Sequence, residues 1–461
     1  MTEEIQVVTI GNAFELVNQR ESSYSQLTKL AKADESHFGQ KTAMWSTRYG
    51  FPKIAVCTSR PSNAILNRIY GHQPPPRFIE PKRISSSICA DLLEDESAIQ
   101  ALLLLLDRKQ KVFIAPYVHT SHVEVFAGFL IKSGYQLIDY YKQAPLVKCL
   151  WSKTEAQRLV FEANDVLNSH RPKSMIAHTD EALVNSLRQY AIRGINKVVV
   201  KSAAAVGGSG VFYVDTNKAA SKLTPLEFLV ASGQNEANRS APFIVEEYVP
   251  WDFSPTVDID ISINGQIDFI GTALQRLHDQ RYYNGFYYSP LLKERWWFKG
   301  VESLAKVVGS RLFELGYTGP ANIDFVVSSK DQRISLIEVN PRRSALIDGY
   351  GILKLKCGSL NDFSVSAADY VNVAPQFHNI TEAFDSFVPN IPLNAEILPV
   401  SDGGFSSTYR WVGMLAVGHD PQDSEDVLLE SVIQLQDPNR NETGSSGQQL
   451  RPLTRISQEA A

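Results

Sequence analysis

Cysteine is scarce in this sequence, and long hydrophobic runs are absent. The four cysteines of the 461 residues lie far apart and follow none of the spacings typical of metal or redox sites. We therefore expect reduced, mostly structural thiols, as in a cytoplasmic protein. The longest apolar run, residues 101–106, is too short to cross a bilayer, and the acidic first residues lack the apolar core of a signal peptide. The cysteines are Cys57, Cys89, Cys149 and Cys357.

The sequence also lacks a large excess of charge of either sign. The formal net charge of −5 gives no bulk attraction to nucleic acid. A hydrophobic fraction of 44% and a charged fraction of 21% are ordinary for globular proteins, and the length suits two or three packed domains. We therefore expect a cytoplasmic protein with small-molecule partners and without nucleic-acid or membrane binding.

The N-terminal third alternates strand-like and helix-like segments. Apolar runs that begin at Ile5, Lys53 and Val112 alternate with helical patterns, such as the one over residues 121–133. Alternation of this kind predicts an open α/β sheet. Residues 73–88 are rich in proline and serine and are expected to form a loop.

The chain is expected to divide into four units and a tail, with an α/β class overall and α+β lobes in the middle. The last segment is rich in glycine, serine and glutamine, which predicts disorder. The units are an N-terminal α/β domain (1–150), a small lobe (151–240), a large lobe (241–357), a C-terminal lobe (358–436) and the tail (437–461).

Residues 321–343 carry the strongest chemical signal. Alternating apolar residues, a polar turn and a second run that ends at Asn340 before a proline predict a β-hairpin. Because strand side chains alternate, Glu338 and Asn340 share one face, and pairing through the turn brings Asp324 near them. Two carboxylates and one amide oxygen are hard ligands that suit Mg²⁺.

Two arginines, Arg342 and Arg343, follow the hairpin directly. A guanidinium binds a phosphate or a carboxylate through paired hydrogen bonds, so both residues are candidates for holding a reacting anion. The alternative is a hairpin with one solvent-facing side, whose polar residues meet only water.

Upstream, an apolar strand ends at Lys201 and runs into a glycine-rich segment. Glycines and small neighbours let backbone N–H groups approach a polyphosphate closely. The spacing matches neither a Walker A loop nor a dinucleotide fingerprint. A later strand carries the paired acids Glu246 and Glu247. The glycine-rich segment contains Gly207, Gly208, Ser209 and Gly210.

This order of motifs resembles the ATP-grasp superfamily, in which two α+β lobes hold Mg-ATP between them. The resemblance implies a pre-ATP-grasp domain at the N-terminus and an extension at the C-terminus. It also implies that Lys201 contacts the nucleotide and that ATP and Mg²⁺ are the cofactors. The implied Mg²⁺ ligands are Asp324, Glu338 and Asn340.

The same resemblance implies roles for further residues. Residues 207–210 would cover the phosphates, and Arg276 would touch the transferred phosphate. Lys153 would reach ATP, or would be a solvated lysine at a helix start. The ribose-binding carboxylate stays open between Glu247 and Asp252. The implied hinge beside adenine consists of Glu246, Glu247, Tyr248 and Val249.

Three polar features allow both a functional and a structural interpretation. His119 and His122 follow a strand end, where α/β sheets bind ligands, yet they suit loop or helix-cap positions equally well. Asp258 and Asp260 share one strand face, which faces a site or solvent. The tyrosine-rich residues 279–290 are expected to form a loop that lines a substrate pocket or packs on the surface.

The resemblance implies an ATP-dependent carboxylate–amine ligase. Such an enzyme activates a carboxylate as an acylphosphate, releases ADP and phosphate, and forms an amide or peptide bond. The lobe order is loosely similar to pheganomycin-type peptide ligases, which implies amino acid or peptide substrates, and a homodimer is possible. The alternatives are an ATP-grasp enzyme with a thiol, carrier-protein or bicarbonate acceptor, and a non-catalytic ATP-binding regulatory protein.

Overall fold

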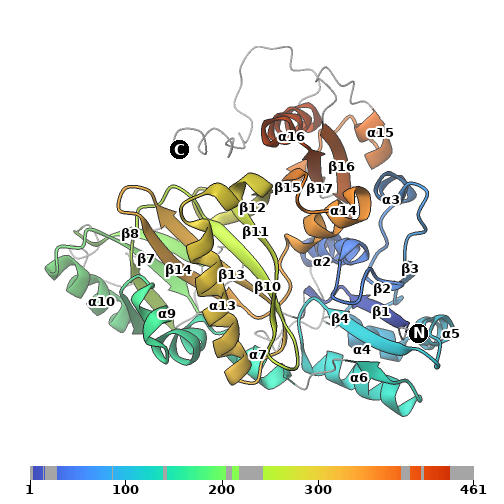
Figure 1. The fold of residues 1–461 in the computed structure, drawn as a ribbon, viewed down its shortest axis with the longest axis horizontal. Helices are drawn as coiled ribbons and strands as arrows, with labels where there is room; N and C mark the ends of the chain where they lie inside the picture. The colour runs from blue at the N-terminus through green and yellow to red at the C-terminus, as the bar shows by residue number, and fades with distance from the viewer. Residues whose placement is uncertain are drawn as a thin grey trace.

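Three β-sheets form the framework of the protein (Figure 1). In the view of Figure 1 the N-terminal sheet lies at the right, the largest sheet crosses the centre, and the third sheet lies at the left. The computed structural model describes residues 4–13, 15, 29–85, 87–138, 143–203, 210–217, 242–385, 395–405 and 410–436, and of residues 29–34 it describes only the backbone. The predicted tail therefore lies outside the described residues.

The N-terminal sheet is parallel, in the order β3-β2-β1-β4-β5, which confirms the predicted α/β character. The expectation of a loop over residues 73–88 is wrong in part. Three residues there form β3, which pairs with β2, and the flanking prolines hide so short a strand in the sequence. The strands are β1 Ile5–Ile10, β2 Ile54–Val56, β3 Arg77–Ile79, β4 Lys111–Pro116 and β5 Leu137–Ile138.

The helices of this part include an amphipathic pair that covers the sheet. Phe126 of α6 and Leu102 of α5 are buried in the same apolar cluster as Ile10 of β1. Asp95 caps α5 by accepting hydrogen bonds from the amides of Ser97 and Ala98. The helices are α2 Lys29–Lys41, α3 Asn63–Tyr70, α4 Ile88–Glu94, α5 Glu96–Leu105 and α6 Ser121–Lys132.

The smallest sheet is antiparallel, in the order β6-β9-β7-β8. The strand with the paired acids, β9, lies at its centre between β6 and β7. Tyr190 of α10 is buried against it and donates its hydroxyl proton to Lys173 O or Val245 O, at 2.8 and 3.1 Å. The elements are α7 Ala144–Leu150, α8 Lys153–Ala156, α9 Asp165–Ser169, β6 Ser174–Ala177, α10 Asp180–Ile192, β7 Lys197–Ser202, β8 Val211–Asp215 and β9 Phe243–Glu247.

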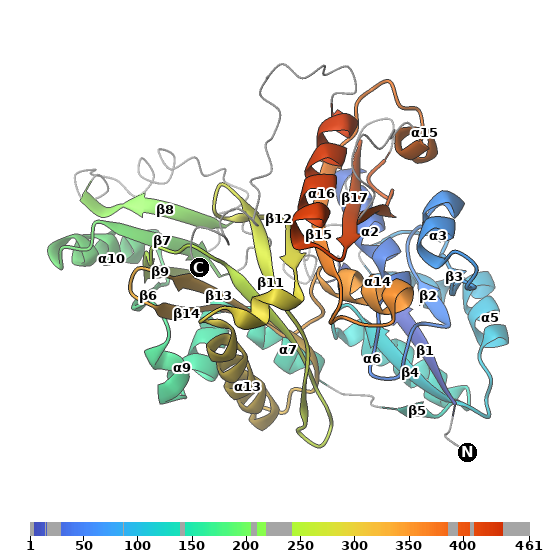
Figure 2. The same ribbon diagram turned by 45° about the horizontal axis from the view of Figure 1, so that its top comes forward.

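The largest sheet has eight strands in the order β14-β13-β10-β11-β12-β15-β17-β16. The C-terminal strands β15 to β17 therefore continue the sheet that contains the predicted metal hairpin (Figure 2). The strands are β10 Pro255–Ile261, β11 Ile267–His278, β12 Tyr282–Tyr288, β13 Gly319–Ser328, β14 Arg333–Asn340, β15 Ser364–Asn372, β16 Ala395–Ser401 and β17 Trp411–Gly418. The helices are α13 Phe298–Glu314, α14 Ile347–Cys357, α15 Ile380–Asp385 and α16 Pro421–Gln436.

The tyrosine-rich segment is mostly a strand, β12, where the sequence suggested a loop. Phe286 and Tyr288 are buried in the same apolar cluster as Val365 and Val417. Gly285 permits the close approach of β12 to β15, since a Cβ at this position would lie 2.1 Å from Ala367 O. Aromatic side chains suit strands, and here they overrode the turn signals in the sequence.

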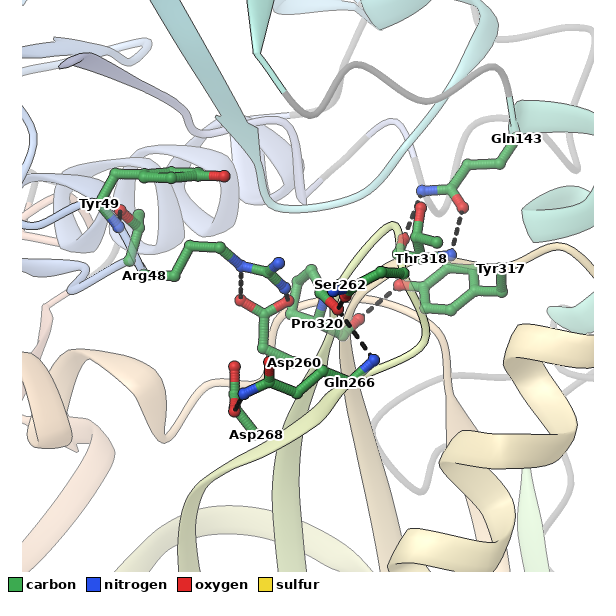
Figure 3. A network of polar contacts seen from close by, with 12 residues as sticks. Arg48, Tyr49, Gln143, Asp260, Ser262, Gln266, Asp268, Tyr317, Thr318 and Pro320 are labelled. Atoms are coloured by element: carbon green, nitrogen blue, oxygen red, sulfur yellow. Dashed lines mark hydrogen bonds and ion pairs between the residues drawn. The ribbon is translucent and has the colours of Figure 1, made fainter. Parts of the chain in front are cut away.

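Polar contacts join the N-terminal sheet to the largest sheet (Figure 3). Arg48 donates two hydrogen bonds to Asp260 of β10, at 3.0 and 2.5 Å. Nearby, the side-chain amide of Gln143 donates to Thr318 O at 2.7 Å and accepts from Thr318 N at 3.0 Å. Asp260 therefore helps to join two parts of the chain, and it is not simply a solvent-facing residue of the strand.

A buried ion pair attaches helix α16 to the same sheet. Arg276 of β11 donates to both carboxylate oxygens of Glu425, at 2.9 and 2.7 Å, and both side chains are at most 4% exposed. Ser366 of β15 donates to Glu425 at 2.7 Å. Breaking a buried pair leaves an uncompensated charge, so this contact is structurally critical.

No helix in the described part of the chain is long and apolar enough to span a membrane.

We expect Arg276→Met to lower the free energy of unfolding by about 3–5 kcal/mol, because Glu425 is left buried without its counter-charge. The double variant Arg276→Met/Glu425→Gln should recover most of this loss. Urea unfolding followed by fluorescence measures both effects. Arg158→Met, which removes an exposed ion pair with Glu155, is the control and should leave the midpoint unchanged. A single variant as stable as the parent would contradict this interpretation.

Candidate functional site

The predicted hairpin forms between β13 and β14. Asp324 lies directly opposite Glu338, and Asn322 lies opposite Asn340. The register of the pairing shifts between Asp324 and Phe325, immediately after these polar residues. The polar side chains of both strands therefore gather on one face.

This face opens onto a cavity of about 450 Å³, here called the central cavity. Residues of β9, β11, β12, β13 and β14 line it, together with Glu35 and Phe38 of α2. A smaller cavity of about 30 Å³ adjoins it and includes Lys153. The predicted site residues that line the central cavity are Lys201, Glu246, Glu247, Tyr248, Val249, Asp324, Glu338, Asn340 and Arg342.

Two lysines approach the carboxylates of the cavity. Lys153 Nζ lies 2.7 Å from Glu338 Oε1. Lys201 Nζ lies 2.6 Å from Glu246 Oε2. Glu246 is also paired with Arg171, and both side chains are buried. Lys153 is therefore a cavity residue and not a solvated lysine at a helix start.

Asp324 is surrounded by hydrogen-bond donors. Its Oδ1 accepts from Thr256 at 2.8 Å and from Gln275 at 2.5 Å, and its Oδ2 accepts from Asn340 at 3.1 Å. Burial, and secondly the nearby charge of Glu338, raise the pKa of Asp324 to about 7. The folded protein therefore disfavours two negative charges at this point.

Glu338 shows the opposite behaviour. Burial opposes its ionisation, but the adjacent charge of Lys153, followed by those of Lys201 and Arg342, holds its pKa below the usual value. Glu338 is therefore ionised at neutral pH, while Asp324 is near its midpoint.

Arg342 lies at the end of the hairpin and contacts both sides of the site. Its Nη2 donates to Asn340 Oδ1 at 3.3 Å, and its Nη1 donates to the hydroxyl of Tyr117 at 3.1 Å. Its guanidinium also lies over the Tyr117 ring, 5.5 Å from the centroid. Arg342 can therefore hold an anion beside the metal residues.

No family model matches the chain, and no curated protein matches it in sequence. Solved structures match over nearly the whole length. The chain has the ATP-grasp fold.

Three structures illustrate the ATP-grasp likeness. Biotin carboxylase from Campylobacter jejuni matches with a TM-score of 0.53 and 13% identity, over 92% of this chain and 90% of that one. N5-carboxyaminoimidazole synthetase from Staphylococcus aureus, complexed with ADP, matches with 0.51 and 11%, over 93% and 97%. N5-carboxyaminoimidazole ribonucleotide synthetase from Thermus thermophilus matches with 0.50 and 14%, over 95% and 100%.

Two of the three predicted arginines lie elsewhere. Arg276 is on the opposite face of β11, paired with Glu425, and does not line the central cavity. Arg343 is buried, donates to Pro116 O at 3.2 Å, and lines a separate small cavity. Side chains alternate along β11, so Gln275 faces the central cavity in place of Arg276. Arg342, the third predicted arginine, follows β14 and lines the central cavity.

The acidic residues of the predicted hinge differ in their surroundings. Glu246 is buried and forms ion pairs with Arg171 and Lys201. It therefore positions Lys201 and is not available to bind a ribose. Glu247 lines the central cavity, whereas Asp252 does not and accepts from Ser329 N at 2.5 Å. Of the two candidate acids, only Glu247 therefore lines the central cavity, and its role at a ribose stays a prediction.

Part of the predicted phosphate loop lies outside the described residues, namely Gly207, Gly208 and Ser209. Gly210 is described, and its carbonyl accepts from Ser202 N at 2.8 Å, which closes the β7–β8 pairing. The role of the loop over the phosphates stays a prediction.

Several cavity residues were missed in the sequence. Gln275 and Asn322 line the central cavity; Gln275 donates to Asp324 at 2.5 Å and Asn322 donates to Asp258 at 3.0 Å. Thr256, behind the cavity wall, also donates to Asp324. The alternation of β11 could have revealed Gln275, because Arg276 and Gln275 cannot share a face. Arg171 precedes a proline in an irregular segment, and no local pattern marks it.

The remaining ambiguous polar residues have structural partners. Asp258 accepts from Ser344 at 2.8 Å as well as from Asn322, and burial raises its pKa to about 6. His119 is buried near Arg343, and burial, then that charge, lower its pKa to about 4. His122 lies 3.9 Å from Glu15, outside the central cavity.

The donor set of the hairpin fits Mg²⁺. The described residues contain no group of three or more His, Cys, Asp or Glu that could hold a metal. Mg²⁺ does not need one, because it commonly uses one or two carboxylates and completes its shell with water and phosphate oxygens. Asp324 and Glu338 face each other, and a dication between them would remove the repulsion that raises the pKa of Asp324. Asn340 can add an amide oxygen.

We expect Asp324→Asn to stabilise the metal-free protein increasingly as pH rises from about 4 to 7. The folded-state pKa of about 7 exceeds the unfolded value of ~3.9, so the cost of ionising Asp324 is absent below pH 4 and complete above pH 7. Urea unfolding of both proteins across this range, with a chelator present, measures the difference. A pH-independent difference would contradict the burial of this carboxylate.

Proposed function

We propose that this protein is an ATP-dependent ligase that activates a carboxylate as an acylphosphate and joins it to an amine, releasing ADP and phosphate. The observation that carries the proposal is the facing pair Asp324 and Glu338 in a cavity with Arg342 and two lysines. Like charges placed opposite each other are unfavourable unless a cation joins them. The partners proposed are an amino acid or peptide and a second small molecule, in a cytoplasmic enzyme.

Each cavity residue has a part in this chemistry. Lys201, which is paired with Glu246, and Lys153, which is paired with Glu338, would donate to phosphate oxygens. Arg342 would hold the substrate carboxylate and then the acylphosphate. A bound Mg²⁺ would neutralise phosphate charge during transfer, with Asp324, Glu338 and Asn340 as its protein ligands. Catalysis would rest mainly on positioning and charge neutralisation.

A second candidate is ATP-dependent carboxylation, in which bicarbonate replaces the organic acid. The fold likeness supports this candidate, since one of the matching structures is a biotin carboxylase. Both candidates use the same hairpin and release ADP, so they differ in the acid and not in the nucleotide site.

The first test is product analysis by ³¹P NMR with protein, ATP, Mg²⁺ and pooled carboxylates and amines. We expect ADP and phosphate only when a pool is present, because the acid must accept the phosphoryl group. ADP formation that needs bicarbonate and no organic acid would favour carboxylation. AMP and pyrophosphate would mean adenylation and would overturn the proposal.

We expect Glu338→Gln to lower kcat on the order of 100-fold or more, because the facing carboxylate pair is lost. Steady-state ADP release measures this effect. Asp331→Asn, at the exposed turn of the same hairpin, is the matched control and should keep the parent kcat. Equal activity of the Glu338 variant would remove Glu338 from the metal site.

A further inference from the structure

The central cavity has a second end, away from the hinge strand β9. Aromatic side chains from four separate parts of the chain line it. We call this region the aromatic end. Its residues are Phe38, Tyr117, Tyr283 and Tyr370.

Tyr370 is aimed into the cavity by an irregularity in β15. The pairing of β15 with β17 shifts register between Ala368 and Val371, and Tyr370 has a left-handed φ of 57°. A bulky residue rarely adopts this conformation, and bulges commonly redirect a side chain. The Tyr370 ring meets Phe38 edge to face, with centroids 6.2 Å apart and planes at 72°.

A buried ionic cluster holds α2 against β15 behind these rings. Lys41 Nζ lies 2.5 Å from Asp369 Oδ1 and 3.4 Å from Asp348 Oδ2. His37 Nε2 lies 3.2 Å from the same oxygen of Asp369. Removing Lys41 would leave Asp369 and Asp348 buried without their counter-charge, so this cluster holds α2 against β15. The aromatic end is therefore preformed before a ligand binds.

Arg342 connects the aromatic end to the metal residues, since it contacts both Asn340 and Tyr117. A carboxylate bound at Arg342 would place its substituent beside the Tyr117 ring. Within the described chain, three basic residues line the central cavity. Lys201 contacts Glu246 and Arg281 donates to Val211 O, both in the smallest sheet, whereas Arg342 contacts Tyr117 of the aromatic end. Behind the rings, Lys41 Nζ lies 5.6 Å from the centroid of Phe38, and its charge is already balanced by Asp369 and Asp348.

We propose that the aromatic end receives the body of the carboxylic acid substrate, and that this body is a flat apolar group about the size of one aromatic ring. Rings stack edge to face on such walls, and a second charge on the acid would find no basic partner there. This inference rests on the proposed ligase function and names its acid. Bicarbonate has no body to fill the aromatic end.

The acid can be tested without knowing the amine. A carboxylate oxygen attacks the γ-phosphorus of ATP, the bond to ADP breaks, and an acylphosphate forms. Added hydroxylamine then attacks the carbonyl carbon, phosphate leaves, and a hydroxamate forms with loss of one proton. Hydroxamate and ADP are measured for 3-phenylpropionate, hexanoate, succinate and bicarbonate. We expect kcat/KM for 3-phenylpropionate to exceed that for hexanoate by about tenfold or more.

Two substitutions test the rings themselves. Phe38→Leu and Tyr370→Asn should each raise the KM for 3-phenylpropionate about tenfold and leave the KM for ATP unchanged. Asparagine is chosen because it tolerates the left-handed backbone. Tyr370→Phe keeps the ring and should behave as the parent. Phe269→Leu removes a ring that is 42% exposed elsewhere and is the matched control.

The outcomes separate the inference from the function on which it rests. Equal use of hexanoate and 3-phenylpropionate, or variants that change the KM for ATP instead, would overturn the aromatic-acid assignment alone. ADP formation that needs only bicarbonate would also overturn it and support carboxylation. No ADP from any acid, with ATP bound, would overturn the ligase function itself.

Discussion

The structure depends on one unfavourable contact, the placement of Asp324 directly opposite Glu338 in a half-buried antiparallel pair. Burial, and secondly the nearby charge of Glu338, raise the pKa of Asp324 to about 7, so two ionised carboxylates there are unfavourable. The positive charges of Lys153 and Arg342 and several amide and hydroxyl donors partly offset the negative charge of the pair. The cavity is therefore organised around a negative centre that a cation would complete.

Much of the fold and part of the site follow from the sequence. The hairpin could be predicted because period-two alternation fixes which side chains share a face, and register places Asp324 opposite Glu338. The same alternation allows only one of the neighbours Gln275 and Arg276 to face the central cavity, and it is Gln275. The family resemblance instead favoured the basic residue, Arg276. Glu246 could not be interpreted correctly, because its partner Arg171 comes from a distant irregular segment. Pairings of this kind depend on tertiary structure that no local pattern encodes.

The C-terminal strands show a further limit of sequence reasoning. A separate lobe was expected over residues 358–436, and its boundaries stay a prediction, but β15 hydrogen-bonds directly to β12 within the sheet of the metal hairpin. Edge-to-edge pairing leaves no composition shift to detect. Tyr288 of β12 is buried in the same cluster as residues of β15 and β17, so its burial depends on this neighbour.

The contact between Lys41 and Asp369 spans most of the chain, since its partners lie 328 positions apart in the sequence. Proteins are made from the N-terminus, and their domains generally fold in the order of synthesis. Helix α2 must therefore wait for α14 and β15 before its buried lysine has both of its counter-charges. The wall formed by Phe38 and Tyr370 is consequently completed only near the end of translation, so a nascent chain released early would carry the hairpin without a finished pocket.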